Sequence, residues 1–242
     1  MHFHLPKPLH GWRELAGEVG IIVVGVLIAL GAEQVVRDMQ ARADQRAFRE
    51  TIDHEIGLNI FVYDVRSRQF TCDAKRDGEL RSWLDQARSG AQVPAIWPTP
   101  PQALTPYRSA WDARDAQVFN SLPAKVRQKY AEFYDELSNN WSLMQAEQDN
   151  WTRLIPYAEI GPITLADRRT VRPIIAEIHG ENETLRANLP ISRDIADVLN
   201  VKEIRPDNLP DEWLKHVADC RSAIASTSET LKLNPVGTSS RP

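Results

Sequence analysis

The feature that most constrains this chain is an apolar run near its amino terminus, within GEVGIIVVGVLIALGAEQVV (residues 17–36). Every residue between Glu18 and Glu33 is Val, Ile, Leu, Gly or Ala. A surface helix of a soluble domain keeps a polar face, and a helix here would have none. Residues 15–36 would form about 33 Å of helix, enough to cross a hydrocarbon core of about 30 Å. We therefore predict a transmembrane helix over residues 15–36, after a short tail of residues 1–14.

The residues that flank this run agree with a retained membrane anchor. Trp12 and Arg13 precede it, where aromatic and cationic residues meet the membrane surface. Glu18 and Glu33 lie near its ends, where charge costs less than at the bilayer centre. Two alternatives stay open: a cleaved signal peptide, which lacks a clean small-residue cleavage site here, and the core helix of a soluble domain.

Small residues within the run suggest that two copies of the helix pack together. Ala16 and Gly20 are four residues apart, and so are Gly25 and Ala29. Such pairs allow two membrane helices to approach closely, although Gly and Ala are common in spans in general. A homo-oligomer is therefore one expected form of the protein.

The side of the membrane on which the following domain lies is weakly indicated. Lys7 and Arg13 favour a cytoplasmic tail, whereas arginines just beyond the run favour the opposite orientation: Arg37, Arg42, Arg46 and Arg49. A short tail before an early span behaves like an uncleaved signal, and a large following domain is exported largely regardless of charge. We slightly favour an exported domain.

The rest of the chain is predicted to be all-α, an elongated helical bundle over residues 37–232 followed by a disordered tail, residues 233–242. Apolar residues recur at helical spacing in two long segments, residues 48–63 and 126–155. Ser121 is expected to cap the second of these helices. Thr164 and Asp167 resemble a capping box for the next helix, which Pro173 is expected to kink or split before a separate helix at 192–200.

A proline-rich loop, residues 91–107, interrupts the helices. It carries five prolines, each of which lacks a backbone donor and restricts the residue before it. Ile96 and Trp97 lie within the loop, and aromatic residues beside prolines can form a recognition patch. The alternative is a loop that packs on the bundle through the same two residues.

Two cysteines, Cys72 and Cys220, are candidates for one disulfide if the domain is exported, and are otherwise buried thiols. His216 and Cys220 have the spacing of metal ligands on a helix, but too few further ligands accompany them to predict a metal site.

Other chemistry-bearing residues favour ordinary structural roles. His54 and Glu55 lack the second histidine of a zinc protease motif, since residue 58 is Leu. His179 lies among Glu177, Glu181 and Glu183, as on a charged helix face. We predict no catalytic residue, no cofactor and no metal. With a net charge of −4, no broad basic field argues for nucleic acid, and we expect none as a partner.

The amino-terminal sequence HGWRELAGEVGIIVVGVLIALGAEQVV resembles the start of uncharacterised bacterial single-pass membrane proteins that carry a GE-[VI]-x-[IV]-VV-G-VLIAL anchor before a helical domain. Three later segments are similar as well: SAWDARDAQVFNSLP, YAEFYDEL and LADRR. The resemblance implies a retained anchor in a bacterial inner membrane and brings no catalytic residue with it.

The resulting hypothesis is a membrane-anchored interaction, scaffold or accessory module of the bacterial envelope. Its expected partners are membrane lipid, a second copy of the chain or an unknown envelope protein. Two alternatives keep the anchor: an enzyme with a site between helices, and a sensor-type ligand-binding module. A third is a secreted protein cleaved near Ala32.

Overall fold

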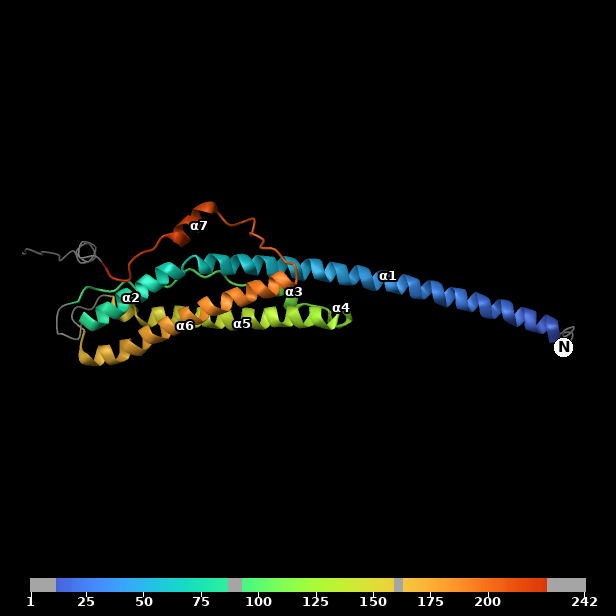
Figure 1. Cartoon of the computed structure of the whole chain (residues 1–242), viewed down its shortest axis with the longest axis horizontal. Helices are drawn as coiled ribbons and strands as arrows, with labels where there is room; N and C mark the ends of the chain where they lie inside the picture. Colours follow the sequence, from blue (N-terminus) through green and yellow to red (C-terminus); the bar gives the residue numbers. More distant parts are fainter. Residues whose placement is uncertain (1–11, 87–92, 159–162, 226–242) are drawn as a thin grey trace, which may run out of the picture. The chain divides into compact units, whose positions relative to one another are not determined.

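The computed structural model describes residues 12–86, 93–158 and 163–225, and Figure 1 gives the order of the elements along the chain. The described residues form helices, joined by loops, and the only strand-like pairing among them is one isolated bridge between Ile96 and Ile224. The all-α prediction is confirmed. Most of the predicted amino-terminal tail and all of the predicted tail 233–242 lie outside the described residues. The elements are α1 (Trp12–Ser67), α2 (Phe70–Gln86), α3 (Ser109–Asp112), α4 (Ala116–Ser121), α5 (Ala124–Arg153), η2 (Ile155–Tyr157), α6 (Leu165–Val198) and α7 (Asp211–Ala218).

The chain divides into two compact units, which are described separately. The amino-terminal unit comprises residues 1–50 and 115–122. The bundle unit comprises residues 51–114 and 123–242. Helix α1 contributes its first part to one unit and its last part to the other.

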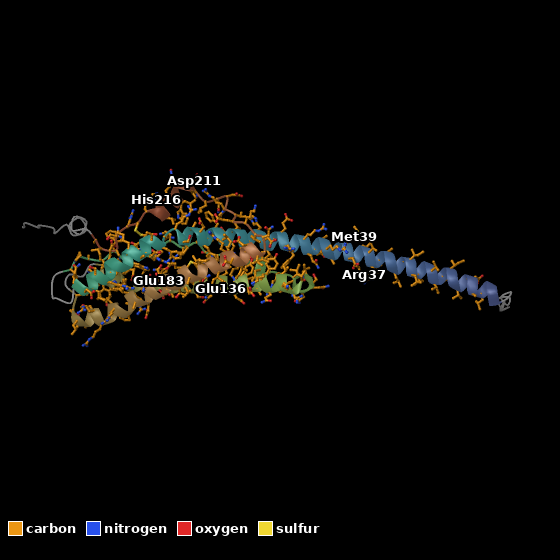
Figure 2. All side chains as sticks on the ribbon, in the orientation of Figure 1. Arg37, Met39, Glu136, Glu183, Asp211 and His216 are labelled. Atoms are coloured by element: carbon orange, nitrogen blue, oxygen red, sulfur yellow. A yellow bond between two sulfur atoms is a disulfide. The ribbon has the colours of Figure 1, made fainter. Side chains whose placement is uncertain are left out.

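In the amino-terminal unit, the apolar part of α1 has no protein around it. The helix contains an 18-residue stretch that is long and apolar enough to cross a membrane, and none of that stretch is buried. Ile21, for example, is 76% exposed. Further along, Arg37 and Met39 also project from the helix (Figure 2). A fully apolar helix surface facing water would be strongly unfavourable. Each large apolar side chain that stays exposed loses the roughly 1.5–3 kcal/mol of stabilising free energy that its burial would provide.

The short helix α4 packs on the other end of this part of α1. The Gln45 side chain donates to the hydroxyl of Ser121 at 2.9 Å, and the rings of Phe48 and Phe119 lie 6.1 Å apart. Asp115 caps α4 through the backbone amides of Gln117 and Val118. Ser121 therefore ends α4, and the prediction that it caps the next helix is wrong, since Pro123 occupies the N-cap of α5.

The bundle unit is built from the last part of α1 with α2, α5 and α6. Side-chain hydrogen bonds give the helix directions. Tyr130 donates to Asp53, and Arg66 reaches Glu147, so α1 and α5 run in parallel. Asn150 on α5 contacts Glu181 on α6, whereas Asn188 contacts Asn140 further back, so α6 runs antiparallel to α5.

Helix α6 is continuous through both of its prolines, and the prediction that Pro173 splits it is wrong. Pro173 and Pro190 are exposed, while neighbouring residues on the other face are buried against α5 and α2. Each proline removes one backbone hydrogen bond, a cost of about 3 kcal/mol or more in an isolated helix. Burial of the apolar face outweighs it, and the helix predicted at 192–200 is the end of α6. The capping box of Thr164 and Asp167 is confirmed.

A close backbone approach explains one glycine of the bundle. Gly57 on α1 accepts a hydrogen bond from the Ile204 amide at 3.0 Å. A Cβ at this position would lie 2.6 Å from the Lys202 carbonyl oxygen. The segment after α6 turns back at Asn200, which adopts a φ of 59°, and then crosses α1 where only glycine fits.

Candidate functional site

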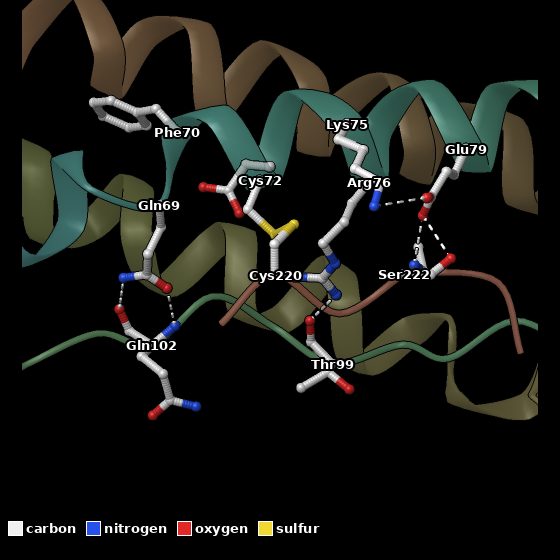
Figure 3. Close-up of a disulfide and its surroundings, with 12 residues drawn as sticks. Gln69, Phe70, Cys72, Lys75, Arg76, Glu79, Thr99, Gln102, Cys220 and Ser222 are labelled. Carbon is white, nitrogen blue, oxygen red and sulfur yellow. Dashed lines mark hydrogen bonds and ion pairs between the residues drawn. A yellow bond between two sulfur atoms is a disulfide. The ribbon is translucent and has the colours of Figure 1, made fainter. Parts of the chain in front are cut away.

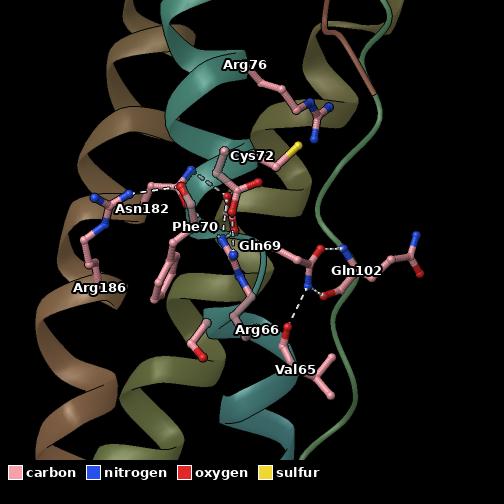
Figure 4. Close-up of polar contacts among 12 residues, drawn as sticks. Val65, Arg66, Gln69, Phe70, Cys72, Arg76, Gln102, Asn182 and Arg186 are labelled. Atoms are coloured by element: carbon pink, nitrogen blue, oxygen red, sulfur yellow. Dashed lines mark hydrogen bonds and ion pairs between the residues drawn. The ribbon is translucent and has the colours of Figure 1, made fainter. Parts of the chain in front are cut away.

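The proline-rich segment lies along α1 and α2 and is held there by side-chain amides. Asn59 donates to the Tyr107 carbonyl and accepts from the Tyr107 amide, both at 2.8 Å. Gln69 makes the same pair of bonds with Gln102, also at 2.8 Å (Figure 4). Each side-chain amide thus donates to and accepts from the backbone of one residue, as a neighbouring strand would. The segment gains backbone partners without forming a sheet.

The other end of the same segment is held by α2. The Trp83 indole donates to the Pro94 carbonyl at 2.7 Å, and the Arg76 guanidinium donates to the Thr99 carbonyl. Arg76 also stacks over the Trp151 ring at 4.1 Å. The segment therefore has polar contacts to the bundle along most of its described length.

A disulfide joins Cys72 on α2 to Cys220, after α7, across 148 residues of sequence (Figure 3). Nearby, the Glu79 carboxylate accepts hydrogen bonds from the Ala223 amide at 2.7 Å and the Ser222 hydroxyl at 2.9 Å. Ile224 then pairs with Ile96 of the proline-rich segment. The described end of the chain is thus fixed both to α2 and to the proline-rich segment.

A hollow of about 450 Å³ lies between α2, the proline-rich segment and α7, beside the disulfide. This volume falls within the range of small-molecule sites, about 300–1,000 Å³. Its lining mixes charged, amide and apolar groups: Gln69, Cys72, Asp73, Arg76, Thr99, Pro100, Pro101, Gln102, Trp213, His216, Val217, Asp219 and Arg221.

Next to this hollow, which Asp73 lines, Arg66 on α1 contacts three other helices through a buried charge network. Its side chain is 1% exposed and contacts Asp73 on α2 at 2.6 Å. The same guanidinium donates to both oxygens of Glu147 on α5, at 2.8 and 3.0 Å, and to the Asn182 amide oxygen on α6 at 2.9 Å. Asn182 in turn donates to Glu147 at 2.9 Å.

Burial and mutual attraction shift the ionisation of this network in different directions. Burial alone would lower the pKa of Arg66, but the adjacent carboxylates of Glu147 and Asp73 raise that pKa overall. Burial raises the pKa of Glu147 to about 7, although Arg66 opposes the shift. Burial also lowers the pKa of Arg76, against the pull of Asp73. Apart from Arg66 Nε and Arg76 Nε, which are buried without a partner, the groups described here are engaged by protein atoms, which suits a structural role better than proton transfer.

A second buried carboxylate, Glu55, fixes α3 to the bundle. It accepts from the backbone amides of Ala110 at 2.7 Å and Trp111 at 3.1 Å, and from the Tyr134 hydroxyl at 2.6 Å. The Trp111 and Tyr134 rings stack 4.3 Å apart. His54, the neighbouring residue in sequence, is exposed.

The predicted site residues lie in different places. In the proline-rich segment, Ile96 is 1% exposed and belongs to the hydrophobic core, so it is not accessible to a partner. Trp97 is 37% exposed and remains on the surface. Cys72 and Cys220 meet in the disulfide.

The small residues of the span are exposed on α1, and a Cβ added at Gly20 or Gly25 would meet nothing within 4 Å. In an α-helix, five residues correspond to a rotation of about 140°. The Ala16–Gly20 pair and the Gly25–Ala29 pair therefore lie on different faces, and one helix–helix contact cannot use both.

The residues weighed for catalysis or metal binding do not converge. Glu177 pairs with Arg153 at 2.9 Å, and His179 lies 3.1 Å from Asp77. His216 on α7 has a side chain 78% exposed (Figure 2). Within the described residues, no group of three or more His, Cys, Asp or Glu is arranged to hold a metal ion.

Comparison with known proteins adds nothing to this description: no family model, curated protein or solved structure matches the chain.

Proposed function

We propose that this protein is a single-pass protein of a bacterial inner membrane whose helical bundle is an interaction module of the envelope. The observation that carries the proposal is the long stretch of α1 that is apolar on every side and buried by no part of the protein. Lipid is the environment that such a surface matches. The resemblance of this stretch to the anchors of bacterial single-pass proteins supports its retention.

The disulfide supports an exported bundle. Disulfides persist in oxidising compartments such as the bacterial periplasm and are rare in the cytosol. The Cys72–Cys220 bond therefore agrees with the weak preference that the sequence gives for a cytoplasmic tail. Export places the arginines just after the span on the outer side, against the usual bias, and a large translocated domain tolerates this.

Binding fits the bundle better than catalysis. Its buried ionisable groups are engaged with one another, and the histidines considered for catalysis are scattered. The partners proposed are membrane lipid for α1, a second copy through one face of the span, and an envelope protein for the bundle. The hollow beside the disulfide favours a second candidate, a sensor-type module that binds a small ligand there.

Alkaline carbonate extraction of bacterial membranes tests the anchor, and protease protection of a carboxyl-terminal tag tests its orientation. We expect the full-length protein in the pellet, and the tag digested only when the outer membrane is permeabilised. Release of the full-length protein into the supernatant refutes the anchor. A tag that becomes accessible only after lysis of the inner membrane refutes export and leaves the anchor standing.

A further inference from the structure

A second hollow, of about 350 Å³, lies between α2 and the first half of α6, away from the disulfide. Its lining is rich in arginine, with Arg81 from α2 and Arg168 and Arg172 from α6, and His179 also lines it. The described lining also includes Asp85, and its remaining residues are apolar: Leu84, Ile175 and Ala176.

The arginines of α6 in this hollow differ from many other exposed arginines of the bundle. Arg68 pairs with Asp64 at 2.5 Å, and Arg205 pairs with Asp211 at 2.6 Å. Arg81, on the opposite wall, pairs with Asp77 at 3.0 Å. Among the described residues, Arg168 and Arg172 have no such partner.

Their spacing makes this lack of partners costly. Arg168 and Arg172 are four residues apart on one helix, where like charges repel and destabilise the helix. The Arg168 Nε atom is in addition buried without a hydrogen-bond partner. Arg66 and Arg76 carry a buried Nε of the same kind, so a ligand is indicated by the two unpaired charges of Arg168 and Arg172 rather than by this atom.

The hollow lies at one end of the bundle unit. Helices α1 and α2 follow one another from Thr51, where the unit begins, to Arg81, about 45 Å further on at 1.5 Å per residue. Figure 1 shows the end of α2 beside the start of α6. The site is thus remote from the point at which α1 enters the bundle.

We propose that this hollow binds a phosphate-bearing ligand through Arg168 and Arg172. Guanidinium groups match phosphate oxygens with paired, charge-assisted hydrogen bonds. Two adjacent guanidinium groups favour an anion with several charged oxygens over a single carboxylate. The terminal nitrogens of both guanidinium groups would donate to the ligand, whose negative charge relieves the repulsion between the two side chains. The site does not depend on the anchor or on export of the bundle.

Isothermal titration of the full-length protein in neutral detergent with inorganic pyrophosphate tests the site. The double variant Arg168→Gln/Arg172→Gln removes both cations from exposed or half-exposed positions, so folding is preserved. The matched control is Arg169→Gln/Arg193→Gln, which loses the same charge from exposed positions outside the hollow. We expect the first variant to bind about tenfold more weakly or worse, at constant ionic strength, since each charge-assisted bond is worth about that factor. The control is expected to bind like the native protein.

A second arm distinguishes the source of the phosphate, using nanodisc-reconstituted protein mixed with vesicles of phosphatidylglycerol or of phosphatidylcholine. Selective binding to phosphatidylglycerol that requires Arg168 and Arg172 identifies a lipid headgroup, and binding of pyrophosphate alone identifies a soluble ligand. Either result supports the site. The proposal is overturned if neither probe binds, if the control variant loses as much affinity as the double variant, or if acetate at equal ionic strength binds as well as pyrophosphate.

Discussion

Arg66 and Glu147, 81 residues apart in sequence, form a two-point ion pair inside the bundle, with Arg66 Nη2 at 2.8 and 3.0 Å from the two carboxylate oxygens. The pair joins α1 to α5, and through Asn182 it also joins α6. Both side chains are almost completely buried. The helices that meet at Arg66 therefore depend on a charged centre rather than on apolar contacts alone.

Removal of one member of this pair should destabilise the bundle strongly. Arg66→Met leaves Glu147 and Asp73 buried without their counter-charge, and we expect a loss of about 3–5 kcal/mol in the free energy of unfolding. Urea titration of the full-length protein in detergent, followed by tryptophan fluorescence, measures it. The control is Arg68→Met, which breaks the exposed pair with Asp64 and should cost less than about 1 kcal/mol. Equal effects of the two substitutions would contradict the role of the network.

Glu147 should make the bundle less stable as the pH rises towards neutrality. Its pKa in the folded protein is about 7, above the ordinary value of 4.5, so the folded state binds more protons between these values. The contribution of this group is complete below about pH 4.5 and is lost as the pH rises through about 7. Unfolding free energies measured from pH 5 to 8 should decline less in Glu147→Gln than in the native protein. If the unfolding free energies of the two proteins change in parallel with pH, this prediction is wrong.

The disulfide should stabilise the bundle by restricting the unfolded chain. It closes a long loop, with 148 residues of separation between Cys72 and Cys220, and such bonds typically contribute about 2–4 kcal/mol. Dithiothreitol is expected to lower the urea midpoint of the native protein by a corresponding amount. The variant Cys72→Ser/Cys220→Ser should unfold at the lower urea midpoint, and dithiothreitol should not change that midpoint. A native midpoint that is insensitive to complete reduction would rule out this contribution.

Gly57 should resist replacement by alanine although it lies within a helix. The new Cβ would approach the Lys202 carbonyl to 2.6 Å, and we expect a net loss of about 1–3 kcal/mol from the backbone shift that follows. Gly78, on α2, has nothing within 4 Å of the same added atom. Gly78→Ala should therefore stabilise α2 by up to about 1 kcal/mol. Thermal unfolding of both variants should show opposite shifts, and a neutral Gly57→Ala would refute the close approach.

If the span self-associates through one of its small-residue pairs, leucine should block it on one face only. We expect Gly25→Leu to reduce dimer formation in membranes several-fold, because the added side chain separates helices at the Gly25–Ala29 face. Gly20→Leu, on the other face, should leave dimers intact. Cysteine cross-linking at single span positions measures the fraction of dimer. Unchanged dimers in both variants would exclude these two faces as the contact.

Much of the helical architecture follows from the sequence, because apolar residues recur at helical spacing. The helical spacing of apolar residues over 48–63 predicts one buried stripe, and Ile52, Ile56 and Ile60 on α1 are buried. The charge network could have been suspected from the same pattern. Arg66 continues the stripe three residues after Tyr63, and Glu147 lies between Met144 and Trp151 on the buried face of α5. A charged residue at an apolar position signals a buried partner, although its identity depends on how the helices pack.

The path of the proline-rich segment could not be predicted. Its prolines exclude a helix, but they do not specify which side chains form hydrogen bonds with its backbone N–H and C=O groups. Asn59 and Gln69 perform this role, and nothing in their local sequence distinguishes them from other polar residues on a helix. Ile96 and Trp97 are adjacent, so sequence alone could not assign one to the core and the other to the surface.

The bond between Cys72 and Cys220 makes most of the bundle a covalently closed ring. A single cut by a protease anywhere between these residues would leave both fragments attached to α1. One such nick could not separate the bundle from the first part of α1 while the disulfide stays intact. Release by a cut inside the ring would also need reduction of the bond, whereas a cleavage before Cys72 would suffice alone.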